Sequence, residues 1–253
     1  MTNELMKNGN MIIAESSEFV RLPNTLNEKQ LQLLLLLVAQ VKPTDEHYNW
    51  ISVQYDDLIE MYNKNVYDKK SIESMKNMIF DLSKKQWCVQ TDTKKYFGHY
   101  IDAGMFDDEN RTINLKLSNE TVYFFLQLDG GKLYTKYAYI KKLHTKCAIQ
   151  LYRWCYLNSN FGNAIPIKIE NAIKLFYDAE NIIPTRHFIQ KHLEPAISKI
   201  NDLTDLHIEY EKVYSKKDKR KISSLKFTIK KYEDCMIEDF EDCEIDYDFF
   251  DDL

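Results

Sequence analysis

The 253-residue sequence has little glycine and little proline, and it lacks the motifs with which enzymes commonly hold a phosphate or a metal. Its six glycines and five prolines form no Gly-rich phosphate loop, and neither G-x-S-x-G nor H-E-x-x-H occurs. A rolling-circle nickase would need a His-apolar-His metal pair close to a tyrosine, and none of the six histidines belongs to such a pair. We therefore expect no enzyme and no cofactor.

Cysteine usage is equally uninformative about chemistry. The five cysteines include no C-x-x-C pair, and their odd number suggests neither a disulfide framework nor a zinc site. His187 and His192 are five residues apart, whereas two metal ligands on one helix face are four apart. We expect ordinary thiols and no metal site.

Long hydrophobic runs are absent. The longest apolar stretch, LQLLLLLVAQV at 31–41, is far shorter than the roughly 18–20 residues of a membrane span. The N-terminus has no basic start followed by an apolar run, so no secretory signal is predicted and a cytoplasmic protein is expected. An apolar content of 44% is typical of globular proteins, and the length suits two domains of about 100–120 residues.

Charge is distributed unevenly. Residues 1–134 contain 15 Lys/Arg and 19 Asp/Glu, a net charge of −4, and residues 135–232 contain 19 and 9, a net charge of +10. Residues 233–253 contain no Lys or Arg and 11 Asp/Glu, a net charge of −11. A basic second half followed by an acidic tail indicates an electrostatic function or a solvated tail.

The first half of the chain has the pattern of a helix, a strand, two helices and strands. TLNEKQLQLLLLLVAQV opens with Thr25 and Glu28 at capping-box spacing, which predicts the start of a long apolar helix. A strand is expected at 50–53, helices at 55–62 and 69–85, and alternating strand segments with a turn at DDEN after them.

The same order returns after the breaker Gly130-Gly131. One long helix is expected at 136–158, then a strand at 165–169, two helices, and a hairpin whose turn is SKKDKRK (215–221). Equivalent units begin 114 residues apart, at the strands containing Ile51 and Ile165. The sequence therefore predicts an α+β fold of two tandem, duplicated winged helix-turn-helix domains.

These signals predict five segments. They are an N-terminal extension (1–20), a first winged helix (21–128), a linker (129–135), a second winged helix that is the principal DNA-binding domain (136–232), and an acidic tail (233–253). One interpretation of the tail is a disordered, solubilising segment. The alternative is a peptide that docks on a partner through Phe240, Phe249 and Phe250, or that competes for the basic surface.

The second domain contains a candidate recognition helix within IIPTRHFIQKHLEPAISKIND (182–202). A winged helix places one helix in the major groove and its hairpin wing on the DNA backbone. At helical spacing the apolar residues from Ile189 to Ile200 share one arc. Base contacts are therefore expected from His187, Gln190 and Lys191 on the opposite arc, and from Arg186, which lies at the edge of that arc in the first turn of the helix. Glu194 would accept from cytosine or pair with Lys191. Because the apolar register continues past Pro195, we expect the proline to bend the helix rather than end it. The alternative is an ordinary amphipathic surface helix.

Basic residues elsewhere suggest phosphate contacts. Those expected on the wing are Lys216, Lys217, Lys219, Arg220 and Lys221, and such contacts weaken steeply with salt. Lys141, Lys142 and Lys146 either reach the flanking backbone or form a solvated helix face. In the first domain, Lys69, Lys70 and Lys76 are possible auxiliary contacts, and that domain could equally serve as a protein-contact module.

Three stretches resemble the iteron-binding replication initiator (Rep) family of bacterial plasmids. They are TLNEKQLQLLLLLVAQV, AIQLYRWCYL at 148–157, and FIQKHLEPAISKINDLTDLHIEYE at 188–211 followed by ISSLKFTI. The resemblance spans about residues 20–231. One departure is Gln150, where the family often has arginine, although Arg153 lies nearby.

The resemblance implies two tandem winged helices that act without cofactor or catalysis. Family members bind direct repeats at the origin as monomers, open an AT-rich region, recruit host replication proteins, and as dimers, usually through the N-terminal domain, repress their own gene. Expected partners are double-stranded DNA, host replication proteins and a second copy, with no membrane and no small-molecule substrate. The alternatives are a winged-helix repressor without origin function and a protein-interaction adaptor that uses the tail and the first domain.

Overall fold

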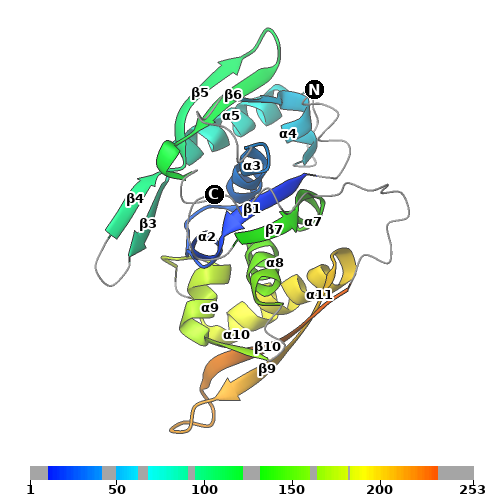
Figure 1. Ribbon diagram of the computed structural model, residues 1–253. Coiled ribbons are helices and arrows are strands. Elements are labelled where there is room, and N and C mark those ends of the chain that lie inside the picture. The colour runs from blue at the N-terminus through cyan, green and yellow to red at the C-terminus, as the bar shows by residue number, and fades with distance from the viewer. Residues whose placement is uncertain are drawn as a thin grey trace, which may run out of the picture.

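The computed structural model describes residues 11–41, 50–61, 68–90, 95–121, 132–159, 164–181 and 183–232. The predicted breaker Gly130-Gly131 and the acidic tail lie outside these ranges. Two α+β modules stack along the long axis of the molecule, and their hairpins project from opposite ends (Figure 1). In the described ranges no helix combines the length and the apolar character that crossing a membrane requires.

Helix α3 (Glu28–Val38) is the centre of the first module, because its leucines are buried on every side. A capping box starts the helix, but it lies two residues later than the sequence predicted. The Asn27 side chain accepts from the Gln30 N–H at 3.0 Å, and the Gln30 side chain accepts from the Asn27 N–H at 3.1 Å. The predicted capping pair of Thr25 and Glu28 is therefore wrong. Thr25 and the buried Leu26 belong to the extended segment that leads into the helix.

The rest of the first module follows the expected order. Strand β2 (Ile51–Gln54) is followed by α4 (Tyr55–Met61) and α5 (Lys69–Ser83), and then by β5 (Ile101–Asp107) and β6 (Thr112–Leu117) in a sheet of order β2-β6-β5. Between α5 and β5 the chain forms a separate hairpin of β3 (Gln86–Gln90) and β4 (Lys95–His99). The buried Trp87 ties this hairpin to the module by donating to Thr121 at 2.8 Å.

The second module repeats this topology. It consists of α8 (Lys146–Asn158), β8 (Ile165–Lys168), α9 (Ile169–Phe176), a helical run at 185–203, β9 (Leu206–Tyr214) and β10 (Ile222–Lys231), with sheet order β8-β10-β9. In both modules the strand before the two helices pairs with the last strand of the hairpin, and β2 and β8 begin 114 residues apart. The predicted duplication is confirmed. Trp154, Phe176 and Phe227 meet edge to face in the core.

The single helix predicted at 136–158 is wrong. The chain forms α7 (Tyr137–Lys142), extended residues around Leu143, and then α8, whose first turn is capped by the Thr145 hydroxyl accepting from the Ala148 N–H at 3.2 Å. The side chain of Gln32, on α3, donates to the Leu143 carbonyl at 3.2 Å. A contact with a residue 111 positions away therefore stabilises the break.

A two-stranded antiparallel sheet lies between the modules (Figure 1). It pairs β1 (Ile12–Ser16), which is followed by the short helix α2 (Ser17–Val20), with β7 (Lys132–Lys136). Strand β1 lies within the predicted extension (1–20), and β7 covers part of the predicted linker (129–135) and ends one residue beyond it, so part of each segment is paired with the other. The domain boundaries stay predictions.

A buried ion pair joins β1 to α8. The side chains of Glu15 and Arg153 are both 0% exposed, and Arg153 Nε donates to Glu15 Oε1 at 3.0 Å. Gln150 accepts from Arg153, and the guanidinium lies 5.2 Å from the centre of the Phe19 ring. Gln150, at the position where the Rep family often has arginine, thus supports Arg153 inside the protein.

Candidate nucleic-acid interface

The predicted recognition helix runs without interruption through Pro195. It comprises α10 (Thr185–Phe188), a π-helical turn η2 (Ile189–Leu193) and α11 (Glu194–Leu203). The Glu194 N–H donates to the Ile189 carbonyl, five residues back. Proline has no N–H, and its ring clashes with the carbonyl four residues back in a regular α-helix. A wider turn directly before Pro195 accommodates that ring, so the prediction of a continuous helix is confirmed.

The two faces of this helix differ in burial as the sequence predicted. Ile189, Leu193, Ala196, Ile197 and Ile200 are all buried. The four candidate base-reading side chains are all exposed: Arg186, His187, Gln190 and Lys191. Their availability to a ligand is therefore established, whereas their contact with bases stays a prediction.

His192 supports the exposed face from behind. Its half-buried ring lies 4.5 Å from the centre of the Tyr177 ring and 5.6 Å from that of His187. Burial, and then the neighbouring His187, lower the pKa of His192. A neutral imidazole is thus favoured at His192, beside His187.

Within the protein Glu194 pairs with residues of β9, and its expected contact with cytosine stays a prediction. Its carboxylate accepts from the Tyr210 hydroxyl at 2.6 Å and lies 3.6 Å from Lys212 Nζ, both on β9. The expected pairing with Lys191 is wrong. Burial and the Glu194 carboxylate raise the pKa of Tyr210, so its hydroxyl stays protonated and donates. The helix is therefore fastened to the first strand of the wing, and the negative charge of Glu194 is partly neutralised.

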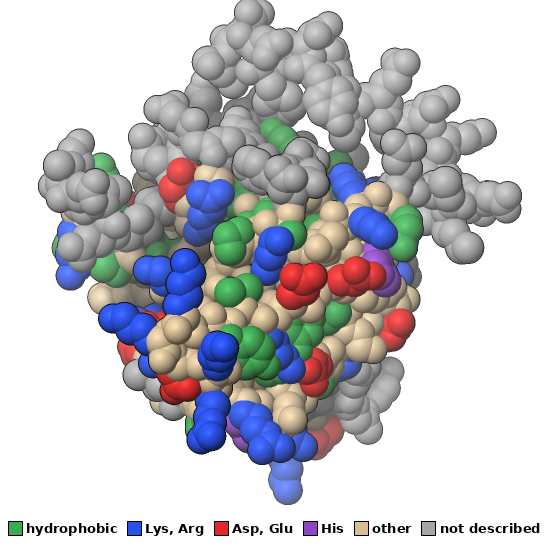
Figure 2. Space-filling model, turned by 90° about the horizontal axis from the view of Figure 1, so that it is seen from below, with side chains coloured by type: hydrophobic (Ala, Val, Ile, Leu, Met, Phe, Trp, Pro, Cys, Tyr) green, Lys and Arg blue, Asp and Glu red, His purple; other side chains and the backbone are tan. Residues whose placement is uncertain are grey.

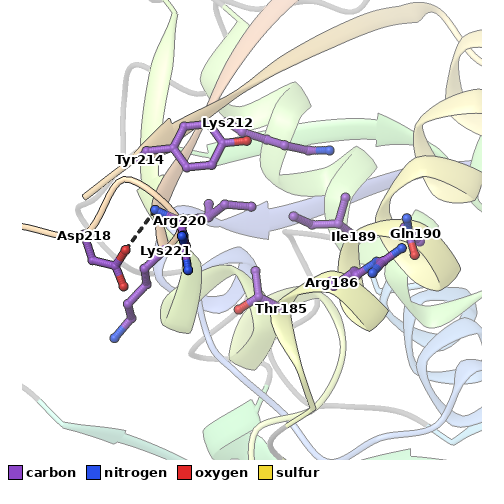
Figure 3. A pocket seen from close by; sticks show the side chains of 10 residues that line it. Thr185, Arg186, Ile189, Gln190, Lys212, Tyr214, Asp218, Arg220 and Lys221 are labelled. Atoms are coloured by element: carbon purple, nitrogen blue, oxygen red, sulfur yellow. Dashed lines mark hydrogen bonds between the residues drawn. The ribbon is translucent and has the colours of Figure 1, made fainter. Parts of the chain in front are cut away.

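A groove of about 550 Å³ separates the start of the helix from the wing (Figure 3). Arg186 and Gln190 lie along the helix side, and side chains of β9 and of the wing turn lie opposite them. The full lining is Thr185, Arg186, Ile189, Gln190, Lys212, Tyr214, Asp218, Arg220, Lys221 and Ile222. The structure thus brings two of the candidate base-reading residues, Arg186 and Gln190, and two of the wing cations, Arg220 and Lys221, to one groove.

The wing turn has a defined backbone. The Ser215 N–H donates to the Lys221 carbonyl at 2.8 Å, and the Asp218 carboxylate accepts from the Arg220 N–H at 2.9 Å. All five predicted wing cations are exposed: Lys216, Lys217, Lys219, Arg220 and Lys221. Figure 2 views this end of the molecule, where Lys and Arg side chains are spread widely and hydrophobic surface lies between them. Their contact with phosphates stays a prediction.

The remaining predicted cations are less closely associated with the groove. Lys141 and Lys142 are exposed on α7, which lies beside the inter-module sheet and away from the wing turn (Figure 1). Lys146 donates to the Asn24 carbonyl at 2.7 Å, and burial lowers the pKa of its ammonium to about 8. Its prediction as a phosphate contact is untested, but the ammonium already has a protein partner.

The three candidate lysines of the first module differ in exposure. Lys69 and Lys70 are exposed in the first turn of α5. Lys76 is 19% exposed, forms a 2.5 Å ion pair with Asp108, and lies 5.6 Å from the centre of the Tyr55 ring. An auxiliary DNA contact is thus easier to reconcile with Lys69 and Lys70 than with Lys76.

Sequence reasoning missed Lys212 and Tyr214 as lining residues. They are two positions apart on β9, so they share one face of the strand, and that face borders the groove. The period-two pattern of LHIEYEKVY together with the adjoining basic turn is the signal that could have identified them.

These elements define a tandem winged-helix protein. Residues 12–156 match the family described as "Initiator Replication protein, WH1", and residues 174–229 match "Initiator Rep protein, WH2". The first match alone covers more than half of the chain, and the chain belongs to this family of replication initiators. No curated protein sequence matches it.

Two solved structures are similar to the chain. The Pi initiator protein, crystallised in complex with iteron DNA, has a TM-score of 0.70 and 14% identity, over 90% of this chain and 99% of that one. Domains 2 and 3 of RctB have a TM-score of 0.49 and 12% identity, over 86% of this chain and 85% of that one. The match to Pi shows that the two proteins share a fold.

Proposed function

We propose that this protein initiates plasmid replication by binding direct repeats (iterons) at the origin through its second winged helix. The observation that carries the proposal is the groove, in which exposed Arg186 and Gln190 face an exposed cationic wing. Membership of the initiator family and a fold shared with Pi, whose crystal structure contains iteron DNA, support it.

The side chains suit double-stranded DNA. Arg186 has the geometry to pair bidentately with guanine, Gln190 with adenine, and Lys191 with guanine or phosphate. The wing cations would neutralise phosphates and release counterions, so that binding weakens with salt. Base contacts would come from the helix, and the wing would set position and affinity.

The proposed consequences go beyond binding. Bound to several repeats, the protein would bend DNA, promote opening of the adjacent AT-rich region and recruit host replication proteins. A second copy of the chain would assemble through the first module, and binding near the promoter would repress the protein's own gene. Each of these steps follows from the proposed class of initiator and needs its own measurement.

Footprinting on the DNA that neighbours the gene, at low and high salt, tests the proposal. Two winged helices that each occupy about one turn of DNA, roughly 10 base pairs, fit repeats of about 20 base pairs. We expect protection of such repeats at low salt and its loss at high salt. A Lys230→Ala variant, which alters an exposed lysine near the far end of β10, should protect them equally. The absence of protection at low salt would contradict the proposal.

A winged-helix repressor without origin function would have the same groove chemistry. A circular DNA carrying the repeats and this gene, with no other initiator, separates the two functions. Maintenance of that DNA supports the initiator. Binding confined to the promoter, without maintenance, would identify a repressor.

A further inference from the structure

The lining of the groove includes both cationic and apolar side chains, and a DNA backbone would contact mainly the cationic ones. The rim of the groove is mainly cationic, with Arg186, Arg220 and Lys221 against the acid Asp218, which suits phosphates. The lining also includes the half-buried Ile222 and the ring of Tyr214, which is 51% exposed, above the buried Ile189. An apolar strip between cations is complementary to a peptide that alternates acids with large apolar side chains.

The chain itself contains such a peptide. Residues 233–253 hold eleven acids and no Lys or Arg, and they include Phe240, Phe249 and Phe250. The net charge of −11 is opposite in sign to the +10 of residues 135–232. The acids match the rim, and the phenylalanines match the strip.

The tail can reach the groove. It follows β10, which runs from Ile222, in the groove, to Lys231 at the far end of the hairpin. Nine residues of strand span about 30 Å, whereas the 21 residues of the tail span up to about 70 Å when extended. Phe249 and Phe250 are therefore within reach if the tail turns back along the second module.

We propose that residues 233–253 dock in the groove, with Phe249 and Phe250 on the apolar strip and the carboxylates on Arg186, Arg220 and Lys221. The docked tail occupies the cations that hold DNA, and so it is a built-in competitor. This inference rests on the proposed function, because it assigns a regulator to the same surface.

The size of the effect follows from tethering. If the isolated peptide binds with a Kd of about 100 µM, an effective concentration of about 1 mM lowers DNA affinity by about tenfold. A simple competitor must leave before any DNA enters. It therefore weakens binding to repeats and to unrelated DNA by the same factor.

Three full-length variants test the docking. One replaces the eleven acids of 233–253 by Asn and Gln, one carries Phe240→Ser, Phe249→Ser and Phe250→Ser, and the control carries Cys235→Ser and Cys243→Ser. We expect the first two to bind repeat DNA and unrelated DNA about tenfold more tightly at low salt, with the control unchanged. Tighter binding by the acid-free variant alone would overturn docking, because plain repulsion of DNA by the tail needs no phenylalanine. No change in either variant would overturn it as well.

A measurement without DNA separates this inference from the proposed function. A labelled peptide of residues 233–253 is titrated into the acid-free variant, and its anisotropy is followed at two salt concentrations. We expect saturable binding that weakens with salt, is lost in Arg220→Ala/Lys221→Ala, and survives Lys230→Ala. Peptide binding without repeat binding would remove the initiator function and leave the docking site. Repeat binding without peptide binding would overturn the docking alone.

Discussion

At the scale of single residues, the exposed side chains of the predicted recognition helix comprise those predicted to read DNA and Glu194, which is held by other residues of the protein. Arg186 lies in the first turn, exposed and on the groove. If it pairs bidentately with a guanine, Arg186→Ala removes about 1–3 kcal/mol of discrimination at that base pair. Competition binding with repeats altered one base pair at a time measures this loss. Arg21→Ala, a change at another exposed arginine, should leave discrimination intact.

Glu194 is the residue that the protein holds. Because its carboxylate lies beside Lys212, that ammonium is partly withheld from DNA. Glu194→Gln keeps an acceptor for the Tyr210 hydroxyl and removes the charge, so affinity should rise for all sequences. If the freed Lys212 contacts one phosphate, the salt slope steepens by about 0.9. Glu209→Gln, on the same strand and exposed, is the control. An unchanged slope for Glu194→Gln would mean that Lys212 does not face the backbone.

At the scale of elements, the wing is predicted to supply affinity without sequence information. Replacing Lys216, Lys217 and Lys219 by alanine should weaken binding to repeats and to unrelated DNA alike, since these side chains meet phosphates rather than bases. The salt slope should fall by up to about 2.7 if all three make contacts. Titrations at several salt concentrations measure it. An unaltered slope would refute the assignment of the wing.

Elements that depend on local pattern could be predicted from the sequence, and those that depend on distant partners could not. The helix through Pro195 followed from an apolar register that continues across the proline, and burial confirms it. The break at Leu143 did not follow from the apolar register. Helices α7 and α8 keep Ile140, Leu143 and Cys147 buried, as one continuous helix would. The break is stabilised by a bond from Gln32, a residue on another module, and no local period in the sequence reveals that contact.

The same distinction applies to the candidate site. The exposed arc and the wing cations follow from helical spacing and from charge, so they were predictable. The partners of Glu194 depend on how β9 packs against α11, which no period in the sequence specifies. Lys212 and Tyr214 were partly predictable. Strand alternation puts both side chains on one face of β9, but it does not say whether that face borders the groove.

At the scale of the whole molecule, the two modules are joined by groups that sequence pattern does not reveal. Strand β1 pairs with β7 about 120 residues later, and Glu15 on β1 pairs with Arg153 on the central helix of the second module. Lys146 adds a bond to the Asn24 carbonyl. These contacts set the position of the first module relative to the groove, so they determine which stretch of DNA each module would meet.

The buried ion pair gives the prediction at this scale. Removing one partner leaves the other charge buried without compensation, which typically costs about 3–5 kcal/mol. We expect Arg153→Met and Glu15→Leu each to lower the free energy of unfolding by about that amount, measured by urea denaturation. The double variant Glu15→Leu/Arg153→Met leaves neither charge, so it should be more stable than the sum of the single changes implies.

A matched exposed pair provides the control for that cycle. Arg111 and Asp56 are bonded at 2.5 Å but are 38% and 56% exposed, so breaking this ion pair should lower the free energy of unfolding by no more than about 1 kcal/mol.

If the Glu15–Arg153 pair also fixes the relative position of the modules, the double variant will bind a single repeat with altered protection at the repeat edge nearest the first module. A footprint identical to that of the unmodified protein would show that β1–β7 pairing is sufficient to position the two modules.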